Sequence, residues 1–176
     1  SGVGGRVAGG YDAPSGEVGR FHALGARVVR NFGGSVRGEA DHLPGGNMSF
    51  RREVFEKVSG FDKRFGGPSI GEETDFCLRA RRAGFRLMFE PRASVDHLHL
   101  PTGGCRTKRF DDWLYWHAHN GMLFALRHAR ASAWPLFVLG RVARFALFAL
   151  EYGSPALMVT GLKGLVRGMA THAQGP

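Results

Sequence analysis

The segment from residue 72 to residue 90 constrains the fold more than any other part of the chain. Its first turn is acidic and its later residues are rich in arginine, which is the charge order that the dipole of a helix favours. Gly84 is a typical helix-ending residue. Residues 85–90 then alternate apolar with charged or thioether side chains, as a strand does. This segment therefore predicts a helix over residues 72–83 followed directly by a strand.

The other elements are predicted more weakly, from local apolar patterns. Ser49 stands where it could cap a short helix, and Pro91 is expected to close the strand that begins at residue 85. No internal repeat is present. The remaining predicted elements are strands over residues 20–24 and 26–32, a short helix over 50–58, an extended stretch over 95–99 and a long helix over 111–130.

The composition changes after Pro135. Residues 134–168 are mostly apolar, but Arg141, Arg144, Glu151 and Lys163 interrupt them, so no charge-free stretch reaches the ~20 residues that a spanning helix needs. A pair of basic amphipathic helices lying in a membrane interface is one interpretation. Helices packed against the rest of the chain are the other. We therefore expect a first region over residues 1–108 and a helical, membrane-associated region over residues 109–176.

The net charge limits the partners. Lys and Arg total 24 against 15 Asp and Glu, a formal charge of +9, which attracts nucleic acid, anionic lipid or phosphorylated small molecules. The basic residues are scattered, with neither the signature of an RNA-recognition sheet nor zinc-finger spacing, so no nucleic-acid partner is expected. Two cysteines, Cys77 and Cys105, make no disulfide framework and indicate a reducing compartment.

Several enzyme classes lack their sequence motifs here. The chain has no Gly-x-x-x-x-Gly-Lys phosphate loop, no Gly-x-Gly-x-x-Gly opening a helix and no Gly-x-Ser-x-Gly. These absences argue against a nucleoside triphosphatase, a dinucleotide-binding module of the usual kind and a serine hydrolase.

Three groups of residues could carry chemistry. Glu72, Glu73 and Asp75 could supply a general base, or could simply be good helix-start residues. His97, with a second histidine two residues later, could bind a metal or be an ordinary surface residue. The glycine pair before Asn47 could let a ligand approach the backbone or form an ordinary turn. Taken singly, each group leaves both interpretations open.

Taken together, the groups form an ordered set of short motifs. In chain order they are Gly46-Asn47-Met48-Ser49-Phe50-Arg51-Arg52, Gly60-Phe61-Asp62, Glu72-Glu73-Thr74-Asp75-Phe76-Cys77-Leu78-Arg79, Arg82-Ala83-Gly84-Phe85, and Pro91-x-Ala93 followed by His97. This order resembles the second half of family 2 glycosyltransferases, over roughly residues 5–130 and most strongly over residues 45–106. The resemblance implies a GT-A fold, a mixed α/β sheet with flanking helices, of which this chain supplies the acceptor-side part.

The resemblance also implies catalytic roles. Glu73 matches the family's catalytic base, with Glu72 before it and Asp75 in the same acidic cluster; the family more often has Asp where Glu73 stands. The base deprotonates an acceptor hydroxyl, which attacks the anomeric carbon and inverts it. His97 matches a histidine that often binds the divalent metal, Mg²⁺ or Mn²⁺, which neutralises the leaving nucleoside diphosphate.

Further expectations concern the substrates. Gly46 and Asn47 would line the floor of the sugar site, and Arg106 would contact phosphate from a loop able to close over it. The Gln-x-x-Arg-Trp motif of processive relatives is absent, which implies addition of a single sugar. The expected partners are a nucleotide-diphosphate sugar donor, a glycan or lipid-linked acceptor and an anionic membrane surface. The expected location is the cytoplasmic face of the cell membrane, with a role in polysaccharide biosynthesis.

One departure from the family pattern matters. Nothing in the sequence resembles the nucleotide-binding first half of the fold or its Asp-x-Asp. We therefore expect the chain to be a fragment that binds nucleotide sugars weakly or not at all by itself. The alternatives are a non-catalytic basic membrane adaptor and a degenerate transferase scaffold. If the glycosyltransferase interpretation is right, Glu73 and His97 face a shared cleft.

Overall fold

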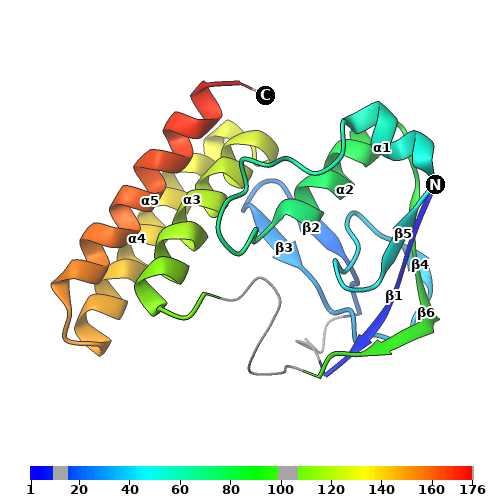
Figure 1. Cartoon of the computed structure of the whole chain (residues 1–176), viewed down its shortest axis with the longest axis horizontal. Helices are drawn as coiled ribbons and strands as arrows, with labels where there is room; N and C mark the ends of the chain where they lie inside the picture. The colour runs from blue at the N-terminus through cyan, green and yellow to red at the C-terminus, as the bar shows by residue number, and fades with distance from the viewer. Residues whose placement is uncertain (10–15, 99–106, 176) are drawn as a thin grey trace. The chain divides into compact units, whose positions relative to one another are not determined.

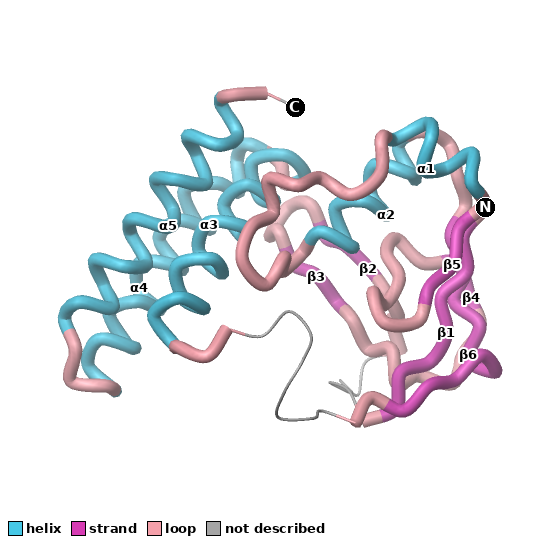
Figure 2. The backbone as a smooth tube through the Cα atoms, viewed as in Figure 1, coloured by secondary structure: helices cyan, strands magenta, loops and turns pink. Residues whose placement is uncertain are grey.

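The computed structural model describes residues 1–9, 16–98 and 107–175, and these residues form two units (Figure 1). The strands belong to one unit and the three longest helices to the other (Figure 2). The strand unit takes residues 1–22, 27–62 and the chain from Glu72 to the end of the second described stretch. Residues 23–26 and 63–71 group with the helical unit. The proposed functional division at residue 108 stays a prediction.

The strand unit contains a four-stranded mixed sheet. Its central strands, β1 and β6, run parallel, and the pairs at both edges are antiparallel. In sheet order the strands are β4 (Gly38–Glu39), β6 (Leu87–Asp96), β1 (Gly2–Ala8) and β5 (Met48–Phe50). The short strands β2 (Arg20–His22) and β3 (Arg27–Val29) pair separately as an antiparallel ladder, where weak strand patterns predicted them. This architecture, with its flanking helices, confirms the predicted α/β class.

The glycine-rich strand β1 was not predicted from the sequence. Glycine is rare in strands, yet here the close approach of other segments requires it. A Cβ on Gly5 would lie 1.8 Å from the Ala93 carbonyl oxygen, and one on Gly4 would lie 2.8 Å from Leu43. A central strand can therefore be glycine-rich when neighbouring backbone and side chains fill the space above it.

Two helices accompany the sheet. α1 (Arg52–Val58) is not capped by Ser49, which lies in β5; its N-cap is Arg51, without a side-chain cap bond. α1 ends at Ser59, which is left-handed with φ 58°. α2 (Glu72–Arg82) closely matches the predicted helix and has acidic residues in its first turn and arginines in its last.

Strand β6 corrects a second expectation. It does not end at Pro91 but continues to Asp96. The ladder with β1 is interrupted here, because Gly5 pairs with Glu90 whereas the next residue, Arg6, pairs with Ser94. Residues 91–93 are thus left out of the ladder, like the extra residues of a bulge, and proline is tolerated because no ladder bond is required of it.

The strand unit has a compact apolar core under the sheet. Phe76 of α2 is fully buried, and its ring lies 4.8 Å from that of Phe50 in an edge-to-face arrangement. The fully or almost fully buried members of this core are Ala40, Leu43, Val54, Phe76, Cys77, Ala80, Leu87 and Phe89. The core joins both helices to the sheet and so fixes the start of α2.

The helical unit consists of three long helices, as the sequence predicted. They are α3 (Phe110–His128), α4 (Trp134–Glu151, preceded by a 3₁₀ turn, η1, Ala131–Ala133) and α5 (Pro155–Ala173). Their buried apolar residues are Leu114, Ala118, Met122, Phe145, Leu157 and Leu165. Among them lies a buried polar group, since the two ring nitrogens of His119 contact Asn120 Oδ1 at 2.7 Å and Thr171 Oγ1 at 3.1 Å.

One segment corrects the expectation that no part of the chain is long and apolar enough to cross a membrane. By length and composition alone the helical segment Ala131–Glu151 could do so, although Arg141 and Arg144 interrupt it. Only Phe145 is buried within α4. One helix of this kind is weak evidence, because soluble proteins contain similar ones.

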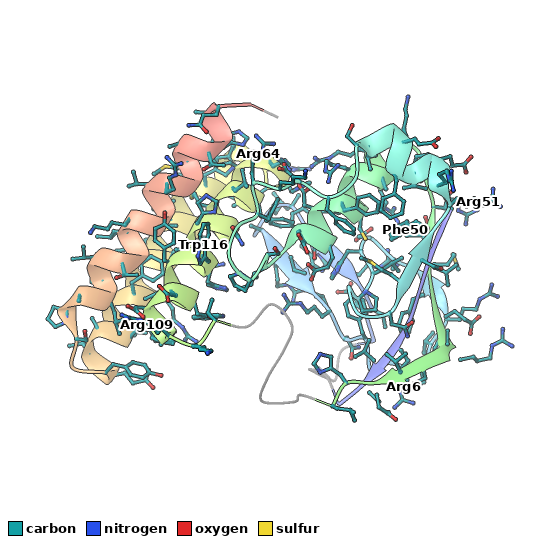
Figure 3. All side chains as sticks on the ribbon, viewed as in Figure 1. Arg6, Phe50, Arg51, Arg64, Arg109 and Trp116 are labelled. Atoms are coloured by element: carbon teal, nitrogen blue, oxygen red, sulfur yellow. The ribbon has the colours of Figure 1, made fainter. Side chains whose placement is uncertain are left out.

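The loop over residues 63–71 is held by α3. The amide of Asn120 donates to the Gly66 carbonyl oxygen at 3.0 Å, and the guanidinium of Arg127 lies over the Phe65 ring. Trp116, labelled in Figure 3, covers the two glycines of the loop: a Cβ on Gly66 would lie 2.3 Å from its ring. Glycine is required here because the indole occupies the space of a side chain.

This contact yields a stability prediction. Gly66→Ala should lower the free energy of unfolding by about 1–3 kcal/mol, because the added methyl group overlaps the Trp116 ring. Gly140→Ala is the matched control, since a Cβ at that helical position meets nothing within 4 Å. The control should be neutral or stabilising by up to about 1 kcal/mol. Denaturant unfolding followed by circular dichroism measures both, and equal midpoints for the two variants would contradict the packing described.

Candidate functional site

Two motifs that are separate in the sequence lie together at the start of α2. The turn before β5 is closed by a hydrogen bond from the backbone N–H of Asn47 to the Pro44 carbonyl oxygen at 3.0 Å. A Cβ on Gly45 would lie 3.4 Å from Glu73 Cγ, so the Glu73 side chain runs along this turn. Gly45 and Gly46 are exposed and Glu73 is half-buried. The result is an open strip of backbone bordered by a carboxylate.

Asn47 has a structural role at this turn. Its side-chain amide donates to the carbonyl oxygens of Arg6 at 3.0 Å and Ala93 at 2.8 Å. Arg6 is the first β1 residue after the interruption in the β1–β6 ladder, close to the end of β1 where it is labelled in Figure 3, and Ala93 is one of the β6 residues that the ladder leaves out. Asn47 thus ties the turn to both central strands. Its contact with a sugar stays a prediction, because its side-chain N–H groups already donate to backbone carbonyl oxygens.

The acidic cluster separates into two groups. Glu72 and Glu73 are half-buried, whereas Asp75 is fully buried and accepts a bond from Arg79 Nε at 2.8 Å. The same arginine donates to the carbonyl oxygens of Val58 and, at 2.8 Å, Gly60, which end α1. These contacts give Asp75 a structural role and provide no support for a catalytic one. The four-residue Asp–Arg spacing on one helix was the available signal.

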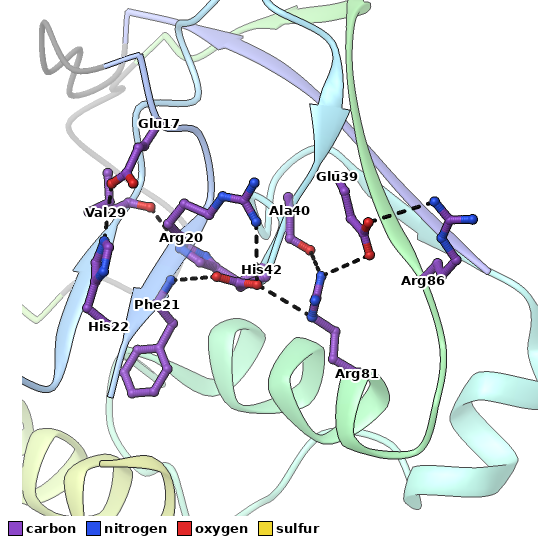
Figure 4. A network of polar contacts seen from close by, with 11 residues as sticks. Glu17, Arg20, Phe21, His22, Val29, Glu39, Ala40, His42, Arg81 and Arg86 are labelled. Atoms are coloured by element: carbon purple, nitrogen blue, oxygen red, sulfur yellow. Dashed lines mark hydrogen bonds and ion pairs between the residues drawn. The ribbon is translucent and has the colours of Figure 1, made fainter. Parts of the chain in front are cut away.

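A network of charges holds the segment before the turn against α2 (Figure 4). Arg81 of α2 donates to the Ala40 carbonyl oxygen at 2.7 Å and lies 3.5 Å from Asp41 Oδ1. Asp41 in turn accepts from the Phe21 amide at 2.9 Å and lies 3.7 Å from Arg20. The network fixes residues 39–42 and therefore the entry to the glycine turn. The sequence analysis treated the arginines late in this helix only as charges that the helix dipole favours.

His42 is a buried residue near the turn that the sequence analysis missed. Its Nε2 donates to the Val29 carbonyl oxygen at 3.0 Å, and its Nδ1 lies 3.5 Å from the hydroxyl of Thr74, the neighbour of Glu73. Burial, the largest influence, lowers its pKa to about 4, although the bond to Val29 opposes the shift. The imidazole is thus neutral near pH 7. Nothing in the local sequence indicates this burial, because it arises from tertiary packing.

The buried thiol of Cys77 is unreactive near neutral pH. Burial, opposed by a hydrogen bond from the backbone at Leu43, raises the pKa of its thiol to about 12, so almost no thiolate forms near neutral pH. Cys77 therefore belongs to the core and not to the site.

The predicted metal ligand is at the end of β6. His97 is exposed, and its backbone amide donates to the Ala8 carbonyl oxygen at 3.0 Å. Within residues 1–9, 16–98 and 107–175, no three His, Cys, Asp or Glu side chains come together as a metal site. His97 offers one imidazole, but these residues do not form a complete cage. The convergence of Glu73 with His97 stays a prediction, and Arg106 and His99 lie outside the described residues.

Comparison with known proteins identifies one family. The sequence model of glycosyl transferase family group 2 matches residues 26–170, which include the turn, all of α2, α3 and α4, and most of α5. No curated protein and no solved structure matches significantly.

His42 yields a prediction on pH and stability. Between pH about 6.5 and about 4 the unfolded chain binds a proton at His42 that the folded chain does not bind, so stability falls as the pH drops through this window. The full effect of this shift is about 3 kcal/mol. In His42→Gln this part of the acid dependence should disappear. Urea unfolding at a series of pH values measures it.

The matched control is His22→Gln, which removes a histidine whose side chain is 41% exposed. The control should keep the steep loss of stability below pH about 6.5. An acid dependence in His42→Gln as steep as that of the unmodified chain would show that another group is responsible.

Proposed function

Because the chain belongs to glycosyl transferase family group 2, we propose that Glu73 is the base that activates the acceptor hydroxyl in sugar transfer. The observation that carries this proposal is the position of Glu73 along the exposed Gly45–Gly46 turn. A carboxylate beside an open strip of backbone can meet a bound hydroxyl group. Asp75 cannot do so from its buried ion pair, and Glu72 is the second candidate.

The reaction that we propose inverts the anomeric carbon. Glu73 takes the proton of the acceptor hydroxyl as the acceptor oxygen forms its bond to the anomeric carbon. The bond from that carbon to the diphosphate oxygen breaks on the opposite side, and the nucleoside diphosphate leaves with the electron pair. A positioned base of this kind contributes about 10²–10⁴ in rate.

The substrates in this proposal are a nucleotide-diphosphate sugar and a glycan or lipid-linked acceptor. The family assignment supports a nucleotide-sugar donor and an acceptor in general terms. The absence of a Gln-x-x-Arg-Trp motif favours transfer of a single sugar, as in the decoration or synthesis of a polysaccharide. In this proposal His97 is one of several ligands of a divalent cation, Mg²⁺ or Mn²⁺.

The location that we propose is the cytoplasmic face of the cell membrane. The net charge of +9 and the exposed, apolar helix α4 support it. A membrane location would also bring the protein close to a lipid-linked acceptor.

Substitution of Glu73 tests the catalytic role. In the chain joined to a nucleotide-binding first half of the family fold, Glu73→Gln should reduce transfer by about 10²–10⁴, because an amide cannot accept the proton. Glu73→Asp keeps the carboxylate and should retain part of the rate. Transfer is measured with uridine, guanosine and thymidine diphosphate sugars in Mn²⁺.

The control is Glu53→Gln, which makes the same change at an exposed carboxylate on α1. Its rate should equal that of the unmodified protein, and thermal unfolding should show that both variants fold. Full activity in Glu73→Gln would remove Glu73 from the base role and leave Glu72 as the candidate.

A further inference from the structure

Helix α5 has an unusual distribution of side chains. Small residues dominate its buried face, where a Cβ on Gly164 would lie 2.4 Å from the Tyr115 carbonyl oxygen and one on Gly168 would lie 2.5 Å from that of His119. On the side of α4, a Cβ on Gly161 would lie 2.5 Å from the Phe145 ring. The buried residues of α5 are Leu157, Gly161, Gly164, Leu165, Gly168 and Thr171. The glycines allow the helix backbones to approach closely.

Larger apolar side chains lie on the opposite, exposed face of α5. The exposed fraction is 51% for Val159 and 61% for Val166. The exposed large apolar residues, which recur at helical spacing, are Val159, Leu162, Val166 and Met169. An amphipathic helix surrounded by water normally turns such a stripe toward the core. In α5 only Leu157 and Leu165 among the large apolar residues are buried, and this second stripe stays exposed, which favours a further apolar environment against it.

The charges on this face indicate what covers it. Lys163 and Arg167 are exposed, lie one turn apart and border a shallow groove that also contains Leu162 and Val166. α5 contains no Asp or Glu. A second copy docked through the same face would bring like charges together, whereas an anionic surface would be attracted to both cations.

We infer that this outer face of α5, formed by Val159, Leu162, Lys163, Val166 and Arg167, docks on a leaflet of anionic phospholipid. The apolar stripe enters the boundary between headgroups and acyl chains, as in other interfacial helices. The long side chains of Lys163 and Arg167 keep their charges at the level of the phosphates.

The neighbouring helix supports docking on the membrane over crossing it. α4 also exposes large apolar residues, namely Leu136, Leu139, Leu147 and Leu150. Arg141 and Arg144 lie in its middle, and a charged side chain at the centre of a bilayer costs about 2.5–3.5 kcal/mol even on the most favourable scale. At the interface the exposed Arg144 would face phosphate groups, whereas Arg141 contacts His117 of α3.

The inference rests on the proposed membrane location, but not on the chemistry of Glu73. Its test is a binding experiment, so failure would leave the proposed catalytic role unaffected. An inactive but vesicle-bound protein would contradict only the catalytic proposal.

The experiment is cosedimentation of the full chain with vesicles of phosphatidylcholine, alone or mixed with phosphatidylglycerol. The chain should bind the mixed vesicles, and less tightly as salt is added. Lys163→Glu combined with Arg167→Glu should weaken binding by at least about tenfold, since each basic residue near an anionic leaflet adds to the free energy of binding and a glutamate in its place is repelled. Leu162→Ser combined with Val166→Ser should also weaken it, because the apolar stripe is lost.

The matched control is Arg51→Glu combined with Arg52→Glu, which changes the net charge equally on an exposed part of the strand unit. It should keep most of the binding. Equal losses in control and α5 variants would show attraction to bulk charge alone and overturn the inference, as would unchanged binding of the α5 variants. A lipid-free dimer in sedimentation velocity that the α5 variants dissociate would assign this face to a second copy instead.

Discussion

The candidate site depends on the side-chain amide of Asn47. Its two bonds, to the carbonyl oxygens of Arg6 and Ala93, bridge the central strands where their ladder is interrupted. Without this donor, the carbonyl oxygens of Arg6 and Ala93 would lose a hydrogen-bond partner at the point where residues 91–93 leave the ladder. The same residue ends the glycine turn along which Glu73 lies. A sequence motif that suggests ligand contact thus acts first as a structural clamp that holds the turn in place.

The two units suit different tasks. In the strand unit, buried ion pairs and hydrogen bonds fix short segments around the start of α2: Arg79 with Asp75, and Arg81 with the backbone before the turn. The helical unit instead buries glycine and exposes larger apolar residues and cations along α5. The first arrangement gives a rigid support for a carboxylate, and the second gives a surface that favours an anionic, partly apolar environment.

Much of this structure could be predicted where periodicity and charge agreed. The helices α2, α3, α4 and α5 followed from such patterns, and the motif order gave the turn and Glu73 as a hypothesis for the site. Strand β1 was missed because its glycines are required by contacts with residues far away in the sequence, such as Ala93. The continuation of β6 through Pro91 was missed because it depends on an interruption of the β1–β6 ladder. The buried states of Asp75 and His42 likewise arise from tertiary packing, which local sequence does not display.

The central claim is that Asn47 holds the turn and both central strands together. The most direct measurement is amide hydrogen exchange in Asn47→Asp, which replaces the donating amide by a carboxylate that repels the two carbonyl oxygens. We predict faster exchange in residues 45–50 and 94–97, with protection in α2 largely kept. Unchanged protection in both segments would contradict the account, because the clamp would then contribute nothing to the geometry of the site.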